Sequence, residues 1–436
     1  MKFDYQKEAR REVLCIDVKS FYASVECVTR GLHPLKTLLV VMSRAENTDG
    51  LVLAASPLAK SQLGLTNVMR RFELPDHPHL KIVPPRMGLY IQENMKINGI
   101  YKQYVAEEDL LVYSIDESFL DVTKSRHLFA TSTYELARKI QAHIHKATGL
   151  YVTVGIGDNP LLAKLALDNG AKHNRDFIAE WRYEDVAQTV WQIQPITNMW
   201  GIGKRTAKRL THFGIHSVKQ LAQANFYDLK EHMGLIGSQL YAHAWGIDRS
   251  VISDVYVPLE KSYGNSQILP RDYTKQAEIE IVIREMADQV AARIRKHQAQ
   301  TGCVSLFIGY SATYIPHDGS RGFRQQMKIS PTNNSQQLID YCLQLFRRHF
   351  KQQEIRQIGI TYSKLTYQET PAIQLNLFKE PEAQLHAIEL DYLIDTIRNR
   401  YGYTSLIHAN SLKPGGTSIV RSSLIGGHAG GMDGLQ

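Results

Sequence analysis

The sequence predicts a multidomain protein that combines helices and strands in an α+β arrangement. At 436 residues the chain is too long for one compact core, so we expect two to four domains. Its composition, with 43% hydrophobic and 22% charged residues, is typical of soluble globular proteins. Short apolar runs of strand length alternate with stretches of helical periodicity, which indicates sheets packed against helices.

Two features of the composition exclude other classes of protein. The first residues, MKFDYQKEARREVLCID, are charged and lack the apolar stretch of a secretory signal, and nowhere do 18 apolar residues run together. We therefore expect a cytoplasmic protein with no membrane partner. The cysteines Cys15, Cys27, Cys303 and Cys342 show no C-x-x-C spacing, so reduced thiols are expected instead of a zinc site or disulfides.

The first predicted element is a strand that ends in a carboxylate. The run VLCID is apolar up to Asp17, as in a buried strand that delivers an acid at its end. The following SFYASVECV indicates the start of a helix, with Ser20 as its N-cap. Residues 36–65 predict strand, polar turn, strand and short helix, which we expect to form a small insertion in a larger sheet domain.

The larger sheet domain continues after this insertion. Its predicted elements are a helix at 88–104, a hairpin at 110–123, a helix at 133–149, a strand at 151–157 and a helix in PLLAKLALDNGAK. The order β-α-β-β-α-β is typical of a ferredoxin-like split βαβ domain. That topology would place Asp17 and Asp116 on neighbouring central strands.

The hairpin contains two adjacent acids, Asp116 and Glu117, within YSIDESFLDV. Neighbouring carboxylates repel each other and raise each other's pKa unless a cation or a proton lies between them, so strand interiors usually avoid the pair. A bound cation would explain it, and a surface turn that holds two acids is the alternative. We expect Asp121, five residues beyond Asp116, to be structural.

A glycine-containing motif follows in PITNMWGIGKRTAKRLTHFG, residues 195–214. Two short helices are predicted around Gly201-Ile202-Gly203, whose glycines permit a tight turn and a close approach to a ligand. The second helix begins with Lys204 and Arg205, and free amides at a helix N-terminus suit the phosphates of a DNA backbone. This layout is that of a helix-hairpin-helix, and an ordinary turn between helices is the alternative.

Positive charge is concentrated in one downstream segment. The whole chain carries 51 Lys and Arg against 43 Asp and Glu, a net charge of +8. Residues 258–365 alone contain 15 basic and 9 acidic residues, a net charge of +6. A basic segment downstream of an acidic site indicates a polyanionic substrate.

Four motifs occur in order between residues 13 and 213: CIDVKSFYASVE, SIDESFLDV, VTVGIGDNPLLAKLALDNGAK and MWGIGKRTAKRL. Together they resemble the Y-family of translesion DNA polymerases in order and spacing. More narrowly, the chain is similar to the UmuC group, the catalytic subunit type of DNA polymerase V, in its Gram-positive, plasmid- or phage-borne form. The resemblance implies a right-hand polymerase that performs error-prone synthesis past DNA damage, in DNA repair and the SOS response.

The resemblance also implies how the chain is divided. Residues 1–20 and 85–182 would form a ferredoxin-like palm, 21–84 small fingers, and 183–250 a thumb with the helix-hairpin-helix. A linker at 251–257 would lead to an α/β little finger at 258–365 and a C-terminal tail at 366–436. Primer-template DNA and dNTPs would be the substrates.

By the same resemblance, the acids would hold two Mg²⁺ ions. Asp17, Asp116 and Glu117 would be the catalytic carboxylates, and the Val18 carbonyl would add an oxygen, the hard ligand type that Mg²⁺ prefers. Ions roughly 4 Å apart would activate the primer 3′-hydroxyl and stabilise the leaving pyrophosphate. The metals would thereby neutralise the repelling acids.

The nucleotide site implied by the family includes Phe21, Tyr22 and Lys172. The Tyr22 ring would lie beneath the sugar as a steric gate against a 2′-hydroxyl, and an ordinary core position for both aromatic residues is the alternative. Lys172 would contact the triphosphate, with a solvated lysine at a helix end as the alternative.

The fingers depart from the family pattern. Many relatives have a Tyr and an Arg three residues apart for the β- and γ-phosphates, and the corresponding positions here are expected to be Leu58 and Ser61 in SPLAKSQLG. Lys60 or a neighbouring basic residue would then substitute. An alignment shifted by one residue is the alternative.

The predicted tail contains QLNLF between Pro371 and Pro381, in a segment not expected to be regular. It resembles the peptide that bacterial polymerases insert into the sliding clamp (the β subunit), with Gln374, Leu375, Leu377 and Phe378 as the binding residues. A Leu-rich stretch of a core is the alternative. Further on, LDYLIDTIRNRYG predicts a helix with an apolar stripe that requires a partner, formed by Leu390, Leu393, Ile394 and Ile397.

Three functions stay open on the sequence. The first is an active, low-fidelity polymerase of the UmuC type, whose need for a UmuD-like protein or RecA the sequence leaves undecided. The second is an enzyme of the DNA polymerase IV type. The third is a clamp-tethered DNA-binding accessory, which the intact Asp17, Asp116 and Glu117 argue against because an inert protein gains nothing from unneutralised acids.

Overall fold

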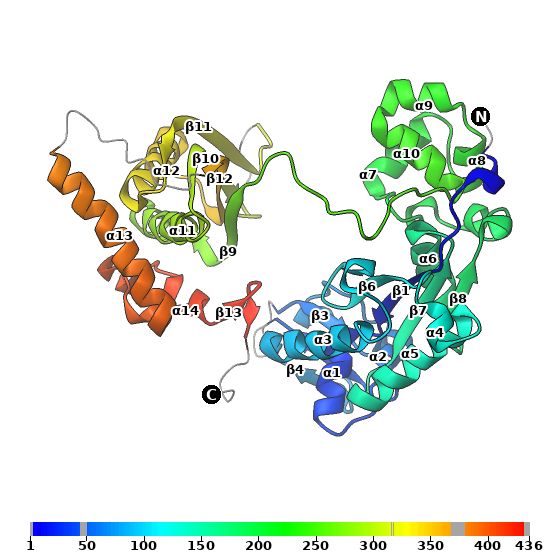
Figure 1. Cartoon of the computed structure of the whole chain (residues 1–436). Helices are drawn as coiled ribbons and strands as arrows, with labels where there is room; N and C mark the ends of the chain where they lie inside the picture. Colours follow the sequence, from blue (N-terminus) through cyan, green and yellow to red (C-terminus); the bar gives the residue numbers. More distant parts are fainter. Residues whose placement is uncertain (1–2, 44–49, 315, 317, 368–379, 431–436) are drawn as a thin grey trace. The chain divides into compact units, whose positions relative to one another are not determined.

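The computed structural model describes residues 3–43, 50–314, 316, 318–367 and 380–430. The chain forms two compact units, Met1–Val255 with His428–Gln436, and Tyr256–Gly427 (Figure 1). The division between Val255 and Tyr256 falls within the stretch 251–257. In the described part of the chain, no helix is both long enough and apolar enough to cross a membrane. The four cysteines are buried free thiols, as predicted.

A five-stranded sheet forms the centre of the first unit, in the order β5-β6-β1-β7-β8. The strands are β1 (Val13–Val18), β5 (Leu110–Val112), β6 (Glu117–Asp121), β7 (Val152–Gly157) and β8 (Ile178–Trp181). β1 pairs antiparallel with β6 and β7, and β8 adds a parallel strand at the edge. The ferredoxin-like order predicted for the first four strands is confirmed.

Helices connect these strands and are drawn in blue to green in Figure 1. They are α1 (Phe21–Thr29), α3 (Met87–Tyr101), α4 (Arg126–Phe129), α5 (Thr133–Thr148) and α6 (Pro160–Ala166), the last followed by a π-helical turn (Leu167–Ala171). α6 lies very close to β7, because a Cβ atom at Gly155 would sit 2.0 Å from the Ala163 carbonyl oxygen. The glycines of VTVGIG therefore allow this helix to approach the sheet.

The insertion predicted at 36–65 is present as a separate small sheet with the order β3-β2-β4. Its elements are β2 (Leu39–Met42), β3 (Val52–Ala55), α2 (Pro57–Leu63) and β4 (Lys81–Val83). Ser56 caps α2, because its side chain accepts a hydrogen bond from the Ala59 amide. Buried aliphatic side chains of these elements form a core of their own.

The remainder of the first unit is helical. Its helices are α7 (Lys204–His212), α8 (Val218–Gln223), α9 (Phe226–Met233) and α10 (Leu235–Ala244). The first helix of the predicted helix-hairpin-helix is only a 3-10 turn, Ile196–Asn198. Proline at 195 and the apolar Met199, which is 1% exposed, leave room for one turn before the chain enters the core.

A four-stranded antiparallel sheet with the order β11-β10-β12-β9 forms the second unit. Its elements are β9 (Tyr263–Tyr273), α11 (Gln276–Lys296), β10 (Ala299–Tyr310), β11 (Gly322–Thr332), α12 (Ser335–His349) and β12 (Ile355–Tyr367). Both helices contribute to the large hydrophobic core of this unit. The exposed side chains along β9 and β11 alternate with more buried ones, as in a sheet with one solvated face.

The C-terminal elements are α13 (Pro381–Tyr401), α14 (Ser418–Ser422), β13 (Leu424–Ile425) and β14 (His428–Ala429). The predicted apolar stripe does not face the rest of this unit: Leu390 is 55% and Leu393 56% exposed. Asp391 and Arg398 are buried in its place. The expected clamp peptide, residues 374–378, lies outside the described residues.

Candidate active site

A cavity of about 790 Å³ opens beside the end of β1 and is lined by β1, the loop after it, α2 and residues 172–173. The chain bends sharply here, because Ser20 adopts the left-handed conformation with φ 50°, which is uncommon for a residue other than glycine. Ser20 stands at the N-cap position of α1 as predicted, but its side chain makes no capping hydrogen bond. The bend turns the residues after Asp17 toward the cavity.

Pairing of β1 with β6 brings the predicted acids together. Asp17 lies opposite Glu117 in the register, and the Val18 amide donates a hydrogen bond of 2.9 Å to the Asp116 carbonyl. Asp17, Val18 and Asp116 all line the cavity. Burial, with a further contribution from the neighbouring Asp116 and Glu117, raises the pKa of Asp17 to about 7. The three acids therefore concentrate negative charge at this end of the sheet.

Glu117 occupies a different environment from the other two acids. Lys164 Nζ donates to Glu117 Oε2 at 2.7 Å, and Cys15 Sγ lies 3.3 Å from Oε1. Lys164 also pairs with Asp168 at 3.1 Å. Across the described residues, no three His, Cys, Asp or Glu side chains are arranged to hold a metal ion. The oxygen donors at the cavity are thus the two carboxylates and the main chain of Val18.

Three lysines face these acids. Lys172 follows the π-helical turn and lies 2.8 Å from Asp168 and 3.9 Å from Asp17. Such turns often occur at functional sites. Lys60 of α2 and Lys19 of the loop after β1 also line the cavity, and neither has an acid partner among the residues that the structure describes. Burial, together with repulsion from Lys172, lowers the pKa of both.

The position of α2 corrects one expectation about the fingers. Leu58 packs against the hydrophobic core of the small sheet, whereas Pro57, Lys60 and Ser61 line the cavity. Because α2 begins at Pro57, positions 57, 60 and 61 share one helical face and 58 points elsewhere. Leu58 therefore does not reach the cavity, and the pair three residues apart that does is Pro57 and Lys60, which favours the alternative of an alignment shifted by one residue.

Both residues of the aromatic pair line the cavity, and they differ in exposure. Phe21 is 2% exposed, and Tyr22 lines the cavity while stacking on Tyr90 with ring centroids 4.4 Å apart. The Tyr90 hydroxyl donates at 2.8 Å to the fully buried Glu26, which also receives two hydrogen bonds from Arg86. This series of contacts fixes the Tyr22 ring.

The helix-hairpin-helix residues are open to a ligand. Gly201 has φ +91° and Gly203 precedes α7, and a Cβ atom at either would meet no described atom within 4 Å. Ile202 is 3% exposed and anchors the turn, while Lys204 and Arg205 are exposed at the start of α7. The arrangement leaves main-chain amides and two cations at one surface.

Sequence reasoning missed several cavity residues. Lys19, Asn67 and His173 line the cavity, and only Lys19 had a usable signal, as a cation two residues after an acid at a strand end. Tyr90 and Lys164 act from behind the lining residues. Their roles depend on tertiary packing that no local pattern reveals.

The chain matches family models over most of its length and a solved DNA polymerase in fold. The family model described as impB/mucB/samB family matches residues 16–168, the model of its HHH motif 183–215, and that of its C-terminal domain 260–377. A solved Y-family DNA polymerase chimera has a TM-score of 0.65 and 22% identity, and the match covers 82% of this chain and 100% of that one. The fold is that of a right-hand polymerase.

Two relatives from Bacillus subtilis (strain 168) match almost end to end. "Putative UV-damage repair protein UvrX" is 39% identical over 426 residues, covering 98% of this chain and 99% of the relative. "DNA polymerase IV 2" is 35% identical over 420 residues, covering 95% and 98%. The chain belongs to the impB/mucB/samB family, that is, to the Y-family of translesion DNA polymerases.

Proposed function

We propose that this polymerase is of the UmuC type and extends a primer opposite damaged template through the cavity at the end of β1. One observation carries the proposal: one cavity is lined both by carboxylates, at Asp17 and Asp116, and by ammonium groups, at Lys19, Lys60 and Lys172. Such a lining suits a nucleoside triphosphate with its metals, because the carboxylates would hold the metals and the lysines would contact phosphate oxygens.

This family uses divalent metal ions, and we propose Mg²⁺ here because the oxygen donors of the cavity fit it. Asp17, Asp116 and the Val18 carbonyl are hard oxygen ligands. The raised pKa of Asp17 shows that its ionised form is unfavourable in the empty cavity, and a bound cation would stabilise that form. Two bound ions would supply activation of the primer 3′-hydroxyl and stabilisation of the leaving pyrophosphate. For Glu117 to contribute a ligand, its carboxylate must exchange the Lys164 contact for the metal.

The other cavity residues would position the nucleotide. Lys60 takes the cationic place that relatives give to arginine, so binding of the triphosphate in the fingers does not depend on Leu58. Lys172 and Lys19 would hold the remaining phosphate oxygens through charge-assisted hydrogen bonds. The Tyr22 ring, fixed by Tyr90, would exclude a 2′-hydroxyl.

The remaining contacts of the proposal serve DNA. The Gly201–Gly203 turn with Lys204 and Arg205 would bind backbone phosphates, and affinity there would fall with salt. Residues 374–378 would tether the enzyme to the sliding clamp. A UmuD-like protein and RecA are further partners that the UmuC type suggests.

The two alternative functions differ in what supports them. An enzyme of the DNA polymerase IV type fits the relative of that name, and a panel of lesion-containing templates would separate it from the UmuC type. The accessory hypothesis drew its support from Leu58 and Ser61. That support is removed, because Lys60 and Ser61 line the cavity and Leu58 does not.

Primer extension by the purified protein tests the proposal. With Mg²⁺ and dNTPs, we expect extension past damaged bases by the parent and none by Asp17→Ala, while both proteins bind primer-template equally, because the carboxylate holds metal and not DNA. Extension by Asp17→Ala at the parent rate would contradict the assignment. Lys146→Ala, an exposed change on α5, is the matched control.

A further inference from the structure

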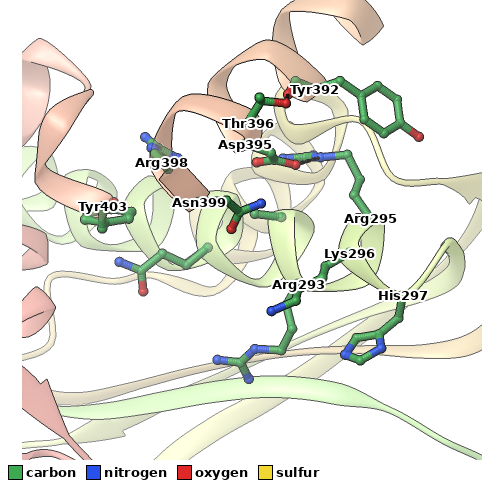
Figure 2. A pocket seen from close by; sticks show the side chains of 12 residues that line it. Arg293, Arg295, Lys296, His297, Tyr392, Asp395, Thr396, Arg398, Asn399 and Tyr403 are labelled. Carbon is green, nitrogen blue, oxygen red and sulfur yellow. Dashed lines mark hydrogen bonds and ion pairs between the residues drawn. The ribbon is translucent and has the colours of Figure 1, made fainter. Parts of the chain in front are cut away.

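A second polar cavity, of about 650 Å³, lies between α11 and α13 in the second unit (Figure 2). We call it the α11/α13 groove. Each helix presents residues spaced by three or four positions: Gln289, Arg293 and Lys296 from α11, and Tyr392, Thr396 and Asn399 from α13. One wall is therefore cationic and the other polar and aromatic. The α13 wall lies beyond residue 377, where the match to the family's C-terminal domain ends.

Buried ion pairs fix the two walls relative to each other. Arg295 of α11 donates to Asp395 of α13 at 2.6 and 3.0 Å and lies 3.5 Å from Asp391. Arg398 of α13 donates to Asp288 of α11 at 2.7 Å. These cations are fully paired and hold α13 in place through its charged face. The groove is thus a built feature of the fold.

The cations that line the α11 wall are not paired in this way. Arg293 donates only to the Gly264 carbonyl, at 3.1 Å, the His297 ring stacks on Tyr263, and Lys296 has no polar partner in the described part of the chain. Beside them, the buried Nη1 of Arg421 has no hydrogen-bond partner among the described residues, and its pKa is lowered by burial with a contribution from Arg293. Arg293 and Lys296 thus line the groove without forming an ion pair with an acid among the described residues.

We propose that the α11/α13 groove binds the sugar-phosphate backbone of single-stranded nucleic acid. Arg293 and Lys296 lie one helical turn apart on one face, so they can contact successive phosphates. Tyr392 and Tyr403 line the groove. Tyr392 is 43% exposed and offers a ring face on which a base can stack, and Arg398 covers one face of the Tyr403 ring, which leaves the other. Cations with aromatic rings are the usual combination in sites for single strands. The volume exceeds that of a lone phosphate and accommodates one or two nucleotides.

This site is separate from the catalytic cavity, since all of its residues belong to the second unit. It also differs from the exposed face of the four-stranded sheet, because α11 packs into the core against the opposite face. A strand held here would add affinity for single-stranded template without entering the cavity that holds Asp17.

The test is binding of a fluorescent oligothymidylate of 20 nucleotides to the full chain over a range of salt concentrations. Replacing Arg293 and Lys296 by Glu should weaken binding at least about tenfold and reduce the slope of log K against log salt by about 1.4, because the variant cannot neutralise two phosphates of the single strand. The matched control, Lys275→Glu with Arg348→Glu, makes the same change of charge at the N-cap of α11 and on α12, and it should have a much smaller effect. Arg293→Lys with Lys296→Arg should bind like the parent.

Three further measurements separate the possible outcomes. Oligonucleotides with photoreactive uracil should crosslink to Tyr392 or Tyr403 in the parent and not in the Glu variant. Incorporation of a single nucleotide on a template whose single-stranded overhang is one base should be unchanged in the Glu variant, so a failure of the groove is distinguishable from a failure of the active site. Equal affinity and slope for the oligonucleotide in parent and Glu variant would overturn the proposal. The proposal would also be overturned if the parent bound a decaglutamate peptide and the Glu variant lost only that binding while it still bound the oligonucleotide, because the groove would then be a site for acidic peptides.

Discussion

Removal of the Lys19 or Lys60 side chain should weaken dNTP binding and at the same time stabilise the folded protein. Both ammonium groups lie in one cavity with Lys172, without an acid partner among the described residues. Their pKa values are lowered by burial and by Lys172, which means that the folded state disfavours the charged form. At neutral pH each charged lysine therefore opposes folding until a phosphate neutralises it.

The size of the effect on binding follows from the hydrogen bond that the substitution removes. A hydrogen bond between an ammonium group and a phosphate oxygen contributes about 1.5–3 kcal/mol. At about 1.4 kcal/mol per factor of ten, Lys60→Ala should raise the KM for dNTP by about 10- to 150-fold. Lys19→Ala should act in the same direction, and Lys60→Arg should retain most of the affinity because the charge is preserved.

Single-nucleotide incorporation at varied dNTP concentration measures this KM, and thermal unfolding measures stability. Lys146→Ala removes an exposed lysine of α5 and should change neither quantity. If Lys19→Ala leaves the KM unchanged while Lys60→Ala raises it, Lys19 is structural and the cavity holds the phosphates with two lysines. A lower melting temperature in both alanine variants would refute the repulsion argument itself.

Four further outcomes are expected. Asp116→Asn should abolish primer extension while primer-template affinity in a gel-shift assay stays within about twofold, since the carboxylate serves metal and not DNA. Tyr22→Ala should keep DNA synthesis but admit ribonucleotides, and unchanged discrimination between dNTP and rNTP would make Tyr22 a core residue only. Lys164→Ala should lower the free energy of unfolding of the first unit by about 3–5 kcal/mol, because it leaves the buried Glu117 carboxylate without its cation; an unaltered denaturation midpoint would argue against this. Leu377→Ala with Phe378→Ala should remove stimulation by the sliding clamp and leave clamp-free extension intact, and persistent stimulation would show that another segment is the tether.

The sequence predicted the central sheet well because its signals are local. The apolar run before Asp17 and the alternation in 151–157 each define a strand by themselves, and the order of elements then leaves few topologies. β8 escaped prediction because a four-residue edge strand carries little pattern. The π-helical turn before Lys172 escaped too, since its residues fit an ordinary helix equally well.

Residues of the candidate active site were predictable where a sequence motif marks them. They were unpredictable where tertiary packing determines which side chains meet. Asp17 and Asp116 follow from their places at strand ends. The Lys164 contact to Glu117 depends on how closely α6 approaches β1 and β7, which only the glycines of β7 indicate. The Leu58 error arose because helix residues one apart differ by about 100° in direction, so the start of α2 decides which side chain reaches the cavity.

The tail helix shows a different limit. The stripe of Leu390, Leu393, Ile394 and Ile397 predicts a helix that requires a partner. Within the second unit, α13 packs through the side with Asp391 and Asp395, because α11 offers Arg295 there, and Leu390 and Leu393 stay exposed. A helix sequence reveals its own two faces but not the chemistry of the neighbour that selects between them.

Whether a charged side chain forms an ion pair within the protein distinguishes structural from ligand-binding groups in this chain. Arg295 and Arg398 each donate a hydrogen bond to a carboxylate. Such ion pairs hold α11 and α13 together and need no ligand to neutralise them. Asp17, Lys60 and Lys296 form no such hydrogen-bonded ion pair within the described residues, and an unpaired charge at a cavity is unfavourable for the empty protein. Lys172 stands between the two cases, since it is paired with Asp168 yet lies 3.9 Å from Asp17. If ligands supply the missing charge, dNTP with metal should raise the melting temperature of the parent more than that of Lys60→Ala, because the empty variant has less repulsion for the ligand to relieve.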